Sequence, residues 1–289
     1  MLKTVWLTEQ PNKEKGRAML LGGFDGLHVG HRKLLSCAKD SGLSVGVMTI
    51  VGGKDKSNLF TFAEREEIFK AAGVDFVFEL PFAEIKDLAP TEFLQLLEEE
   101  FSPKLFVCGT DFRFGARAAG TAEMLKQSTQ VCVEVIPLVE MDGEKVSSSY
   151  VKALLDAGDV IKVNALLTHP FFLVGQVYAD RKVGRTIGFP TANILYPTDK
   201  YPLKIGVYES RVCVDGKTYK GITNYGARPT FADETVVTET YLDGFDGNLY
   251  GKTLKIEFIR YLRDVQKFNG VDALKTQLEE DLRRVREDD

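Results

Sequence analysis

Residues 22–31 read GGFDGLHVGH, and this stretch holds two of the chain's three histidines among four glycines. An apolar run at 18–21 precedes it and an amphipathic run at 32–38 follows, so the pattern predicts a strand, a glycine-rich turn and a helix. Glycine lets a backbone approach a phosphate closely, and a helix N-terminus offers free N–H groups and a positive dipole end to an anion. We therefore predict a nucleotide triphosphate site. Its expected residues are Gly22, Phe24, Asp25, His28, Gly30 and His31.

The two histidines of this stretch allow a second interpretation. His28 and His31 are three residues apart, so on a helix they could both reach one anion. The same spacing occurs in zinc sites, but zinc needs further ligands, and the nearest cysteine, Cys37, occupies an ordinary helical position. Core histidines rarely accompany a glycine turn. The strand–turn–helix context favours the phosphate site.

Composition limits the remaining possibilities. The chain has 289 residues, 44% of them hydrophobic, which suits one large or two ordinary domains. Its net charge of −5 argues against a general nucleic-acid binder, because such a protein needs a basic face. Residues 1–17 lack the apolar region of a signal peptide, and no run reaches the length of a membrane span.

The four cysteines are scattered and show no CxxC spacing. Cys108, Cys132 and Cys213 lie in strand-like runs, so we expect them to be buried free thiols. Free thiols indicate a reducing compartment, and we expect the protein in the cytoplasm.

The first half of the chain alternates between strand and helix patterns, which predicts an α/β domain with a parallel sheet and helices on both sides. Thr61 and Glu64 have the spacing of a capping box that opens a helix through residue 72. A second helix is expected at 91–100. Ligands of such sheets bind at the carboxyl ends of the strands, where residues 22–31 lie. The expected strands are 18–22, 45–50, 76–80, 105–108 and 131–136.

The second half is rich in short strands separated by turns, which predicts an antiparallel β-barrel or sandwich. An amphipathic helix at 271–286 should cover it, with an apolar stripe of Val271, Leu274, Leu278, Leu282 and Val285. We place the domain boundary after residue 160, which gives domains of 1–160 and 161–289. The expected strands are 171–178, 206–214, 218–224, 235–242 and 253–261.

Two further loops of the first half combine residues that suit a nucleotide. Residues 108–115 read CGTDFRFG, where Asp111 and Phe112 could line a pocket for a flat heterocycle or form an ordinary loop with a helix cap. Residues 146–152 read VSSSYVK. Ser148 and Ser149 at a helix start, with Lys152 one turn on, suit phosphates, but a serine cap with a surface lysine is a common alternative.

The densest loop of the second half is GRTIGFPTAN at 184–193. Thr191 and Asn193 alternate onto one face of an extended segment and both present oxygen, which suits Mg²⁺; a plain turn entering a strand is the alternative. Glu239 lies in a strand, where an exposed glutamate is the default interpretation. Arg260 and Arg263 are candidate flavin contacts or surface charges.

Together, these motifs resemble the bacterial bifunctional riboflavin kinase/FAD synthetase family over nearly the whole chain and in the same order. GGFDGLHVGH is similar to its nucleotidyltransferase signature, CGTDFRFG to its second block and VSSSYVK to its triphosphate-binding block. The segments GRTIGFPTAN, YGARPTF, NLYGK and FIRYLRDVQKF are similar to its kinase blocks.

The resemblance implies a Rossmann-like nucleotidyltransferase domain and a riboflavin-kinase-like barrel. The barrel would phosphorylate riboflavin to FMN with ATP, and the N-terminal domain would join FMN to the AMP part of ATP, giving FAD and pyrophosphate. Thr191 and Asn193 match the family's Mg²⁺ ligands, and Glu239 matches its catalytic carboxylate. His28 and His31 would act at the adenylyl step. The ATP-binding set would include Gly184 and Gly188, and the flavin-binding set is Asp111, Phe112, Arg260 and Arg263.

Two departures from the family pattern concern the N-terminal half. The family usually has arginine where this chain has Lys152, which keeps the charge but loses the bidentate fork. The family also usually has a proline-rich loop after the second strand, whereas residues 49–58 contain no proline. Three alternatives stand beside the bifunctional enzyme: a relative with one activity, a flavin- or nucleotide-binding regulatory protein without turnover, and another nucleotidyltransferase with an appended β-domain. The last would leave the C-terminal motifs unexplained.

Overall fold

The structure is a computed structural model that describes residues 2–8, 16–53, 57–179, 188–227 and 236–287. The chain forms two compact units, Met1–Tyr150 and Val151–Asp289, which are described separately below. The functional boundary expected after residue 160 stays a prediction. In the described part of the chain, no helix is long and apolar enough to cross a membrane.

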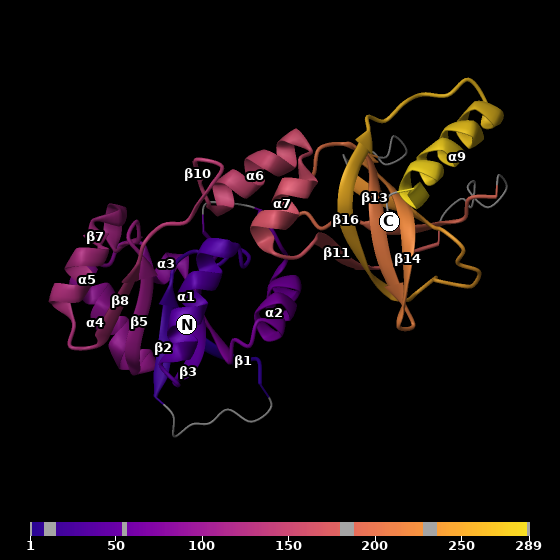
Figure 1. The fold of residues 1–289 in the computed structure, drawn as a ribbon. Coiled ribbons are helices and arrows are strands. Elements are labelled where there is room, and N and C mark those ends of the chain that lie inside the picture. The colour runs from indigo at the N-terminus through magenta and orange to yellow at the C-terminus, as the bar shows by residue number, and fades with distance from the viewer. Residues whose placement is uncertain (1, 9–15, 54–56, 180–187, 228–235, 288–289) are drawn as a thin grey trace. The chain divides into compact units, whose positions relative to one another are not determined.

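The N-terminal unit is built on a six-stranded sheet, as predicted for the α/β half (Figure 1). The strand β2 (Arg17–Leu21) pairs in parallel with β3 on one side and with β5 on the other. The chain therefore runs outward from β2 in both directions, which creates the switch point where such sheets bind ligands. Only β1 is antiparallel to its neighbour, β4. The sheet order is β1 (Lys3–Trp6), β4 (Phe76–Pro81), β3 (Ser44–Val51), β2, β5 (Pro103–Gly109) and β8 (Cys132–Ile136).

Local sequence signals explain two helices of this unit. Helix α2 (Phe62–Ala71) opens with the predicted capping box: the N–H of Thr61 donates to Glu64 Oε2 at 2.9 Å, and the N–H of Glu64 donates to Thr61 Oγ1 at 3.3 Å. Helix α4 (Pro90–Phe101) begins with proline. Proline lacks an N–H group, but an N–H in the first turn of a helix has no intrahelical acceptor, so nothing is lost there. The remaining helices are α1 (Val29–Asp40), α3 (Phe82–Ile85) and α5 (Ala122–Ser128), with a 3₁₀ turn at Ala116–Ala118.

Aromatic packing fills one face of the sheet. Phe76, Phe78 and Phe106 are fully buried there. The rings of Phe76 and Phe78 occupy the space beside Gly46, where a Cβ atom would come within 2.3 Å of the Phe76 ring. Gly46 is therefore needed for close packing within strand β3.

The C-terminal unit is a curled antiparallel sheet, in agreement with the predicted barrel. Its two outer strands approach each other: the N–H of Tyr178, just beyond β11, donates to the carbonyl of Asn193 on β12 at 3.0 Å. A Cβ on Gly175 would lie 2.3 Å from Ile194, so glycine permits this approach. The sheet order is β11 (Phe171–Gln176), β16 (Thr253–Arg263), β13 (Gly206–Val214), β14 (Lys217–Ala227), β15 (Val236–Leu242) and β12 (Thr191–Leu195).

Within the described residues, the later helices are α6 (Ser148–Ala157), α7 (Val160–Leu167) and α9 (Val271–Glu287). Helix α9 lies against β14, as Figure 1 shows, and buries Leu282 and Val285. The expected stripe is wrong at its start, because Val271 is 57% exposed. Leu278 packs against the same cluster as Leu282 and Val285, so the stripe holds from the middle of the helix onward.

The cysteine expectation is partly corrected. All four thiols are free, and Cys108 is buried. Burial raises the pKa of the Cys108 thiol to about 11. Cys132 and Cys213 are exposed, because their side chains alternate to the solvent side of β8 and β13.

Candidate active sites

The glycine-rich turn joins β2 to α1, and His28 caps the helix. Its backbone is extended (φ −74°, ψ 168°), and its Nδ1 accepts a hydrogen bond from the N–H of His31 at 3.2 Å. A Cβ on Gly30 would lie 3.1 Å from the His28 ring. Glycine at position 30 therefore gives the imidazole room to fold back over the first turn.

Hydrogen bonds assign the ring nitrogens of both histidines. His31 Nδ1 lies 2.8 Å from the carbonyl of Gly26, which can only accept, so Nδ1 carries the proton and Nε2 is left for a ligand. His28 Nδ1 is an acceptor, so neutral His28 carries its proton on Nε2. The rings stack with centroids 3.7 Å apart and planes at 14°. The pair is thus held rigidly at the helix start.

Burial makes both imidazoles poor bases. It lowers the pKa of His28 from 6.5 to about 4, although a backbone hydrogen bond and the charge of Asp111 oppose the change. Burial also lowers the pKa of His31 well below its usual range, and the neighbouring His28 adds to this effect. Both rings are neutral at pH 7 in the free protein. Among the described residues, no group of three or more His, Cys, Asp and Glu side chains could hold a metal ion.

Phe24 and Asp25 belong to the turn but do not line the pocket described below. Phe24 is buried with its ring centroid 4.4 Å from that of His31. Asp25 Oδ1 accepts from the N–H of Leu59 at 2.8 Å, which ties the turn to the segment before α2. Both residues support the site from outside the pocket described below, and their predicted phosphate contacts stay predictions.

The loop after β5 brings the second predicted motif to the same edge of the sheet. Asp111 pairs with Lys145 (Oδ2 to Nζ, 2.5 Å), which lies on the hairpin of β9 (Glu140–Met141) and β10 (Glu144–Lys145). Phe112 is buried and stacks on Phe114 with centroids 5.5 Å apart. An ion pair between two separate segments therefore lies at the edge of the site.

The serine motif follows this hairpin directly. Ser147 Oγ accepts from the N–H of Tyr150 at 3.2 Å and so caps the start of α6. Ser148 lines the pocket beside Ser147, whereas Ser149 is exposed. Lys152 belongs to the C-terminal unit, where its Nζ lies 5.1 Å from the ring centroid of Tyr201. The predicted phosphate roles of Ser149 and Lys152 stay predictions.

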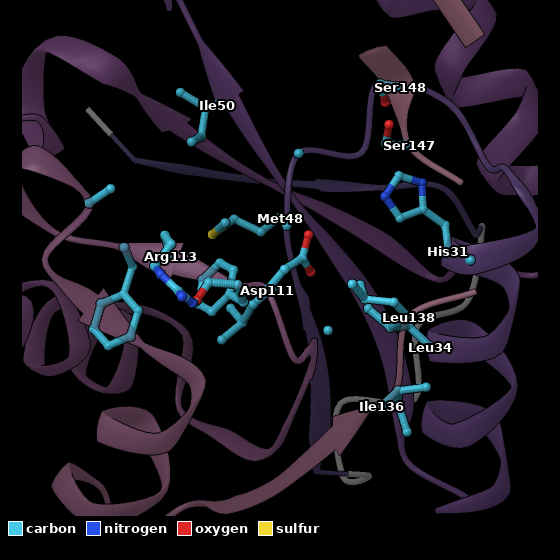
Figure 2. A pocket seen from close by; sticks show the side chains of 18 of the residues that line it. His31, Leu34, Met48, Ile50, Asp111, Arg113, Ile136, Leu138, Ser147 and Ser148 are labelled. Carbon is cyan, nitrogen blue, oxygen red and sulfur yellow. The ribbon is translucent and has the colours of Figure 1, made fainter. Parts of the chain in front are cut away.

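A pocket of about 820 Å³ lies at the carboxyl ends of β2, β3, β5 and β8. In Figure 2, Ser147, Ser148 and His31 gather on one side, and Arg113 lies on the other. The pocket has the size of a cavity that takes a nucleotide-sized ligand. Its predicted lining residues are Gly22, His28, Gly30, His31, Asp111, Phe112 and Ser148.

The C-terminal unit brings its predicted residues together through strand pairing. Asn193 on β12 is directly opposite Glu239 on β15, and Thr191 is opposite Tyr241. Asn193 is 7% exposed, and its buried Oδ1 has no hydrogen-bond partner in the described ranges. An unsatisfied oxygen beside a carboxylate fits a divalent cation with oxygen ligands, so the Mg²⁺ expectation agrees with this donor set.

The remaining predicted residues of this unit have other surroundings. Arg260 pairs with buried Glu209 at 3.0 Å. Arg263 makes a bidentate ion pair with Asp281 of α9, which is completely buried. Gly188 is exposed with φ +83°, and Gly184 lies outside the described residues. The flavin contacts predicted for the two arginines, and the ATP contacts predicted for the glycines, stay predictions.

Comparison with known proteins decides the family. Residues 10–150 match the model described as FAD synthetase, and residues 167–288 match the one described as riboflavin kinase. The bifunctional riboflavin kinase/FMN adenylyltransferase of Bacillus subtilis is 34% identical over 97% of this chain and 96% of its own. The chain belongs to this bifunctional family. The predicted resemblance is therefore confirmed.

Two further relatives agree along the whole length. The Haemophilus influenzae enzyme of the same name is 32% identical over 93% of this chain and 92% of its own. A crystal structure from Streptococcus pneumoniae, described as a macrolide-efflux protein, has a TM-score of 0.87 at 30% identity and covers 96% of this chain and 95% of its own. The match confirms that both units belong to one known architecture.

Sequence reasoning missed several residues that line the pocket of the N-terminal unit. Arg113 belongs to the CGTDFRFG motif and lines the pocket, but only Asp111 and Phe112 of this motif were predicted as site residues. Ile50 and Leu138 are large apolar side chains that stay more than 40% exposed at the pocket, and such exposure at strand ends is a sign of a binding site. Further lining residues with no clear local signal are Met48, Phe82, Lys86, Arg117 and Lys145.

Proposed function

We propose that the two units divide the family's two reactions: residues 151–289 phosphorylate riboflavin to FMN, and residues 1–150 adenylylate FMN to FAD. The observation that carries the N-terminal assignment is the stacked histidine pair at the start of α1 inside the pocket. The cross-strand pair of Asn193 and Glu239 supports the C-terminal assignment.

The adenylyl step needs charge stabilisation rather than a base. A phosphate oxygen of FMN, already anionic, attacks the α-phosphorus of ATP. The new P–O bond forms as the bond to the bridging oxygen of pyrophosphate breaks, and pyrophosphate leaves. Negative charge builds up at the start of α1, where free N–H groups and His28 Nε2–H lie.

His31 would respond to the bound phosphates. It is neutral in the free protein, and its Nε2 is the ring nitrogen not used by Gly26. A neighbouring anion raises an imidazole pKa, so triphosphate binding would be accompanied by proton uptake, and protonated His31 could then donate to a phosphate oxygen. Ser148 lies at the start of α6 and could hold the departing phosphates.

The pocket also offers a suitable place for the flavin. Its wall includes Met48, Ile50 and Leu138, which are apolar, and Phe112, which is aromatic. A flat isoalloxazine ring favours such a surface. Asp111 lies at the same wall and could hydrogen-bond the ring edge, provided that its pair with Lys145 opens.

The kinase step uses the strand residues. The ribityl 5′-hydroxyl of riboflavin attacks the γ-phosphorus of ATP, the bond to the bridging oxygen of ADP breaks, and the hydroxyl proton passes to Glu239. Thr191 and Asn193 would hold Mg²⁺ through their side-chain oxygens. Bound there, the cation would neutralise phosphate charge.

The proposal extends to the cellular setting. All four cysteines are free thiols, and both reactions consume ATP. We propose a cytoplasmic protein whose partners are its small substrates: ATP, riboflavin and FMN.

A chromatographic time course tests the division of reactions. Purified protein with Mg²⁺ and ATP receives riboflavin in one tube and FMN in another. FAD from both tubes, with FMN appearing first in the riboflavin tube, is expected. FMN without FAD would mean that only the kinase works, FAD from FMN alone would mean that only the N-terminal unit works, and flavin binding without conversion would support the regulatory protein.

A further inference from the structure

Three polar residues form a row across neighbouring strands of the C-terminal unit. Glu239 on β15 is opposite Asn193 on one side and opposite Asn224 of β14 on the other. Directly paired residues of an antiparallel sheet place their side chains on the same face. Glu239 is therefore flanked by two amides.

The hydrogen-bond pattern gives the spacing of this row. The N–H of Tyr196 donates to Val236 O, so alternation along β12 and β15 makes Asn193 and Glu239 a non-hydrogen-bonded pair, with Cα atoms about 4.5 Å apart. The bond from Asp243 N–H to Lys220 O similarly makes Asn224 and Glu239 a hydrogen-bonded pair, about 5.5 Å apart. Both amides are therefore direct cross-strand neighbours of the carboxylate.

The opposite face of these strands has a different composition. Thr223 and Thr240 point there, are fully buried and hydrogen-bond each other at 2.9 Å. The row instead shares its face with Ile222 and Tyr241, which pack in the cluster with α9. Asn224 is therefore a polar residue on a largely apolar face.

Both amide oxygens of the row lack donors. Asn193 Oδ1 and Asn224 Oδ1 are buried, and neither has a hydrogen-bond partner within the described part of the chain. A buried acceptor left unsatisfied is costly. Two such oxygens beside a carboxylate also repel one another, because all three groups are acceptors when the carboxylate is ionised. A hard cation removes both costs at once.

We propose that Asn224 is a further residue of the kinase site and that its Oδ1, together with Asn193 Oδ1, faces the divalent cation that accompanies ATP. This inference deepens the proposed function and rests on it. None of the sequence motifs pointed to Asn224. Strand register alone brings this residue beside Glu239.

Manganese binding tests this role directly. Free Mn²⁺ is followed by electron paramagnetic resonance in the presence of ADP and FMN, with the full chain and with Asn224→Leu. Loss of one oxygen should weaken Mn²⁺ binding roughly tenfold or more, while manganese held elsewhere is the same in both proteins. Asn224→Asp keeps an oxygen and adds charge, so it should bind Mn²⁺ more tightly than the unaltered chain.

Controls separate a local effect from misfolding and from failure of the kinase assignment. Asn269→Leu changes an exposed asparagine of the same unit and should leave Mn²⁺ binding unaltered. Equal Mn²⁺ binding by Asn224→Leu and the unaltered chain, with normal FMN formation, overturns the inference alone. If Asn224→Leu fails to fold, a failure of Asn224→Asp to tighten binding overturns it. No FMN from riboflavin in the unaltered chain overturns the kinase assignment itself.

Discussion

The two units build phosphate chemistry from different parts of their sheets. The N-terminal site lies at the ends of parallel strands, where loops and helix starts supply His28, Ser148 and Asp111 around a pocket. The C-terminal residues lie on the face of an antiparallel sheet, where pairing aligns Asn193 with Glu239. The first arrangement depends on loop conformation and the second on register. Substitutions should therefore separate the two reactions on a single chain.

The largest expected effect is on the first unit. His31→Ala removes an imidazole stacked at the helix start, and FAD formation from FMN should fall by about 10²-fold or more, since groups that stabilise developing charge contribute about this much. FMN formation from riboflavin should stay nearly intact. Separate rate measurements with each flavin check this. His169→Ala, which changes the third histidine, is the matched control. Loss of both activities in folded His31→Ala protein would contradict the assignment of the two reactions to separate units.

The reciprocal change is Glu239→Gln, which keeps the shape of the side chain but removes the base. FMN formation should fall by about 10²-fold, within the usual range for a general base, while FAD is still made from added FMN. Initial rates from the two flavins provide the measurement. Glu257→Gln, in strand β16 of the same sheet, should alter neither rate. Unchanged riboflavin phosphorylation in Glu239→Gln would remove this residue from the proposed mechanism.

A third change tests whether α9 holds the second unit together. Asp281 is fully buried and pairs with Arg263 at 2.7 Å. Asp281→Ala leaves the arginine without its carboxylate, and loss of one partner of a buried pair costs about 3 kcal/mol. Denaturant unfolding of the full chain should show an earlier transition for this unit. Arg283→Ala breaks an exposed pair on the same helix and should change stability by less than about 1 kcal/mol; equal effects would show that the buried pair has no special role.

The smallest effect is a pH dependence confined to the first unit. The pKa of His28 is about 4 in the folded chain, against an ordinary value of 6.5 for an exposed histidine, as in the unfolded chain. Below pH 6.5, the unfolded chain therefore binds a proton at His28 that the folded chain does not bind. Stability therefore falls as pH falls, and His28 by itself contributes about 1.4 kcal/mol of the loss between roughly pH 7.5 and 5.5. His31, whose pKa is also lowered, adds to this loss. Thermal unfolding across this range measures the loss. Replacement of His28 by glutamine should remove its share of this loss and leave the share of His31, whose pKa is also lowered by burial; an equally steep profile would assign the loss to other groups.

Local signals predicted the parts of the fold that are close in sequence. The capping box of Thr61 and Glu64, the strand–turn–helix of the histidine motif and the alternation of Thr191 with Asn193 all concern neighbours along the chain. Each reflects a contact that the sequence shows directly. These expectations agree with the observed elements.

Long-range contacts were not visible in the sequence. Lys145 meets Asp111 only because a hairpin folds over the loop after β5. Arg263 finds Asp281 only when α9 packs on the sheet. The exposure of Cys132 and Cys213 likewise depends on which strand faces are covered, and a run of apolar neighbours does not reveal this.

The row of Asn193, Glu239 and Asn224 has a consequence for insertions and deletions in the gene. Because strand side chains alternate, one codon inserted within β15 ahead of Glu239 would turn the carboxylate toward the buried threonines and bring Thr238 or Thr240 to the cation side. Codons added to the turn after Leu242 would leave the row intact. In homologous sequences, insertions and deletions should therefore be found in the turns and be absent from β12, β14 and β15. This should hold even where the inserted residue is small and polar.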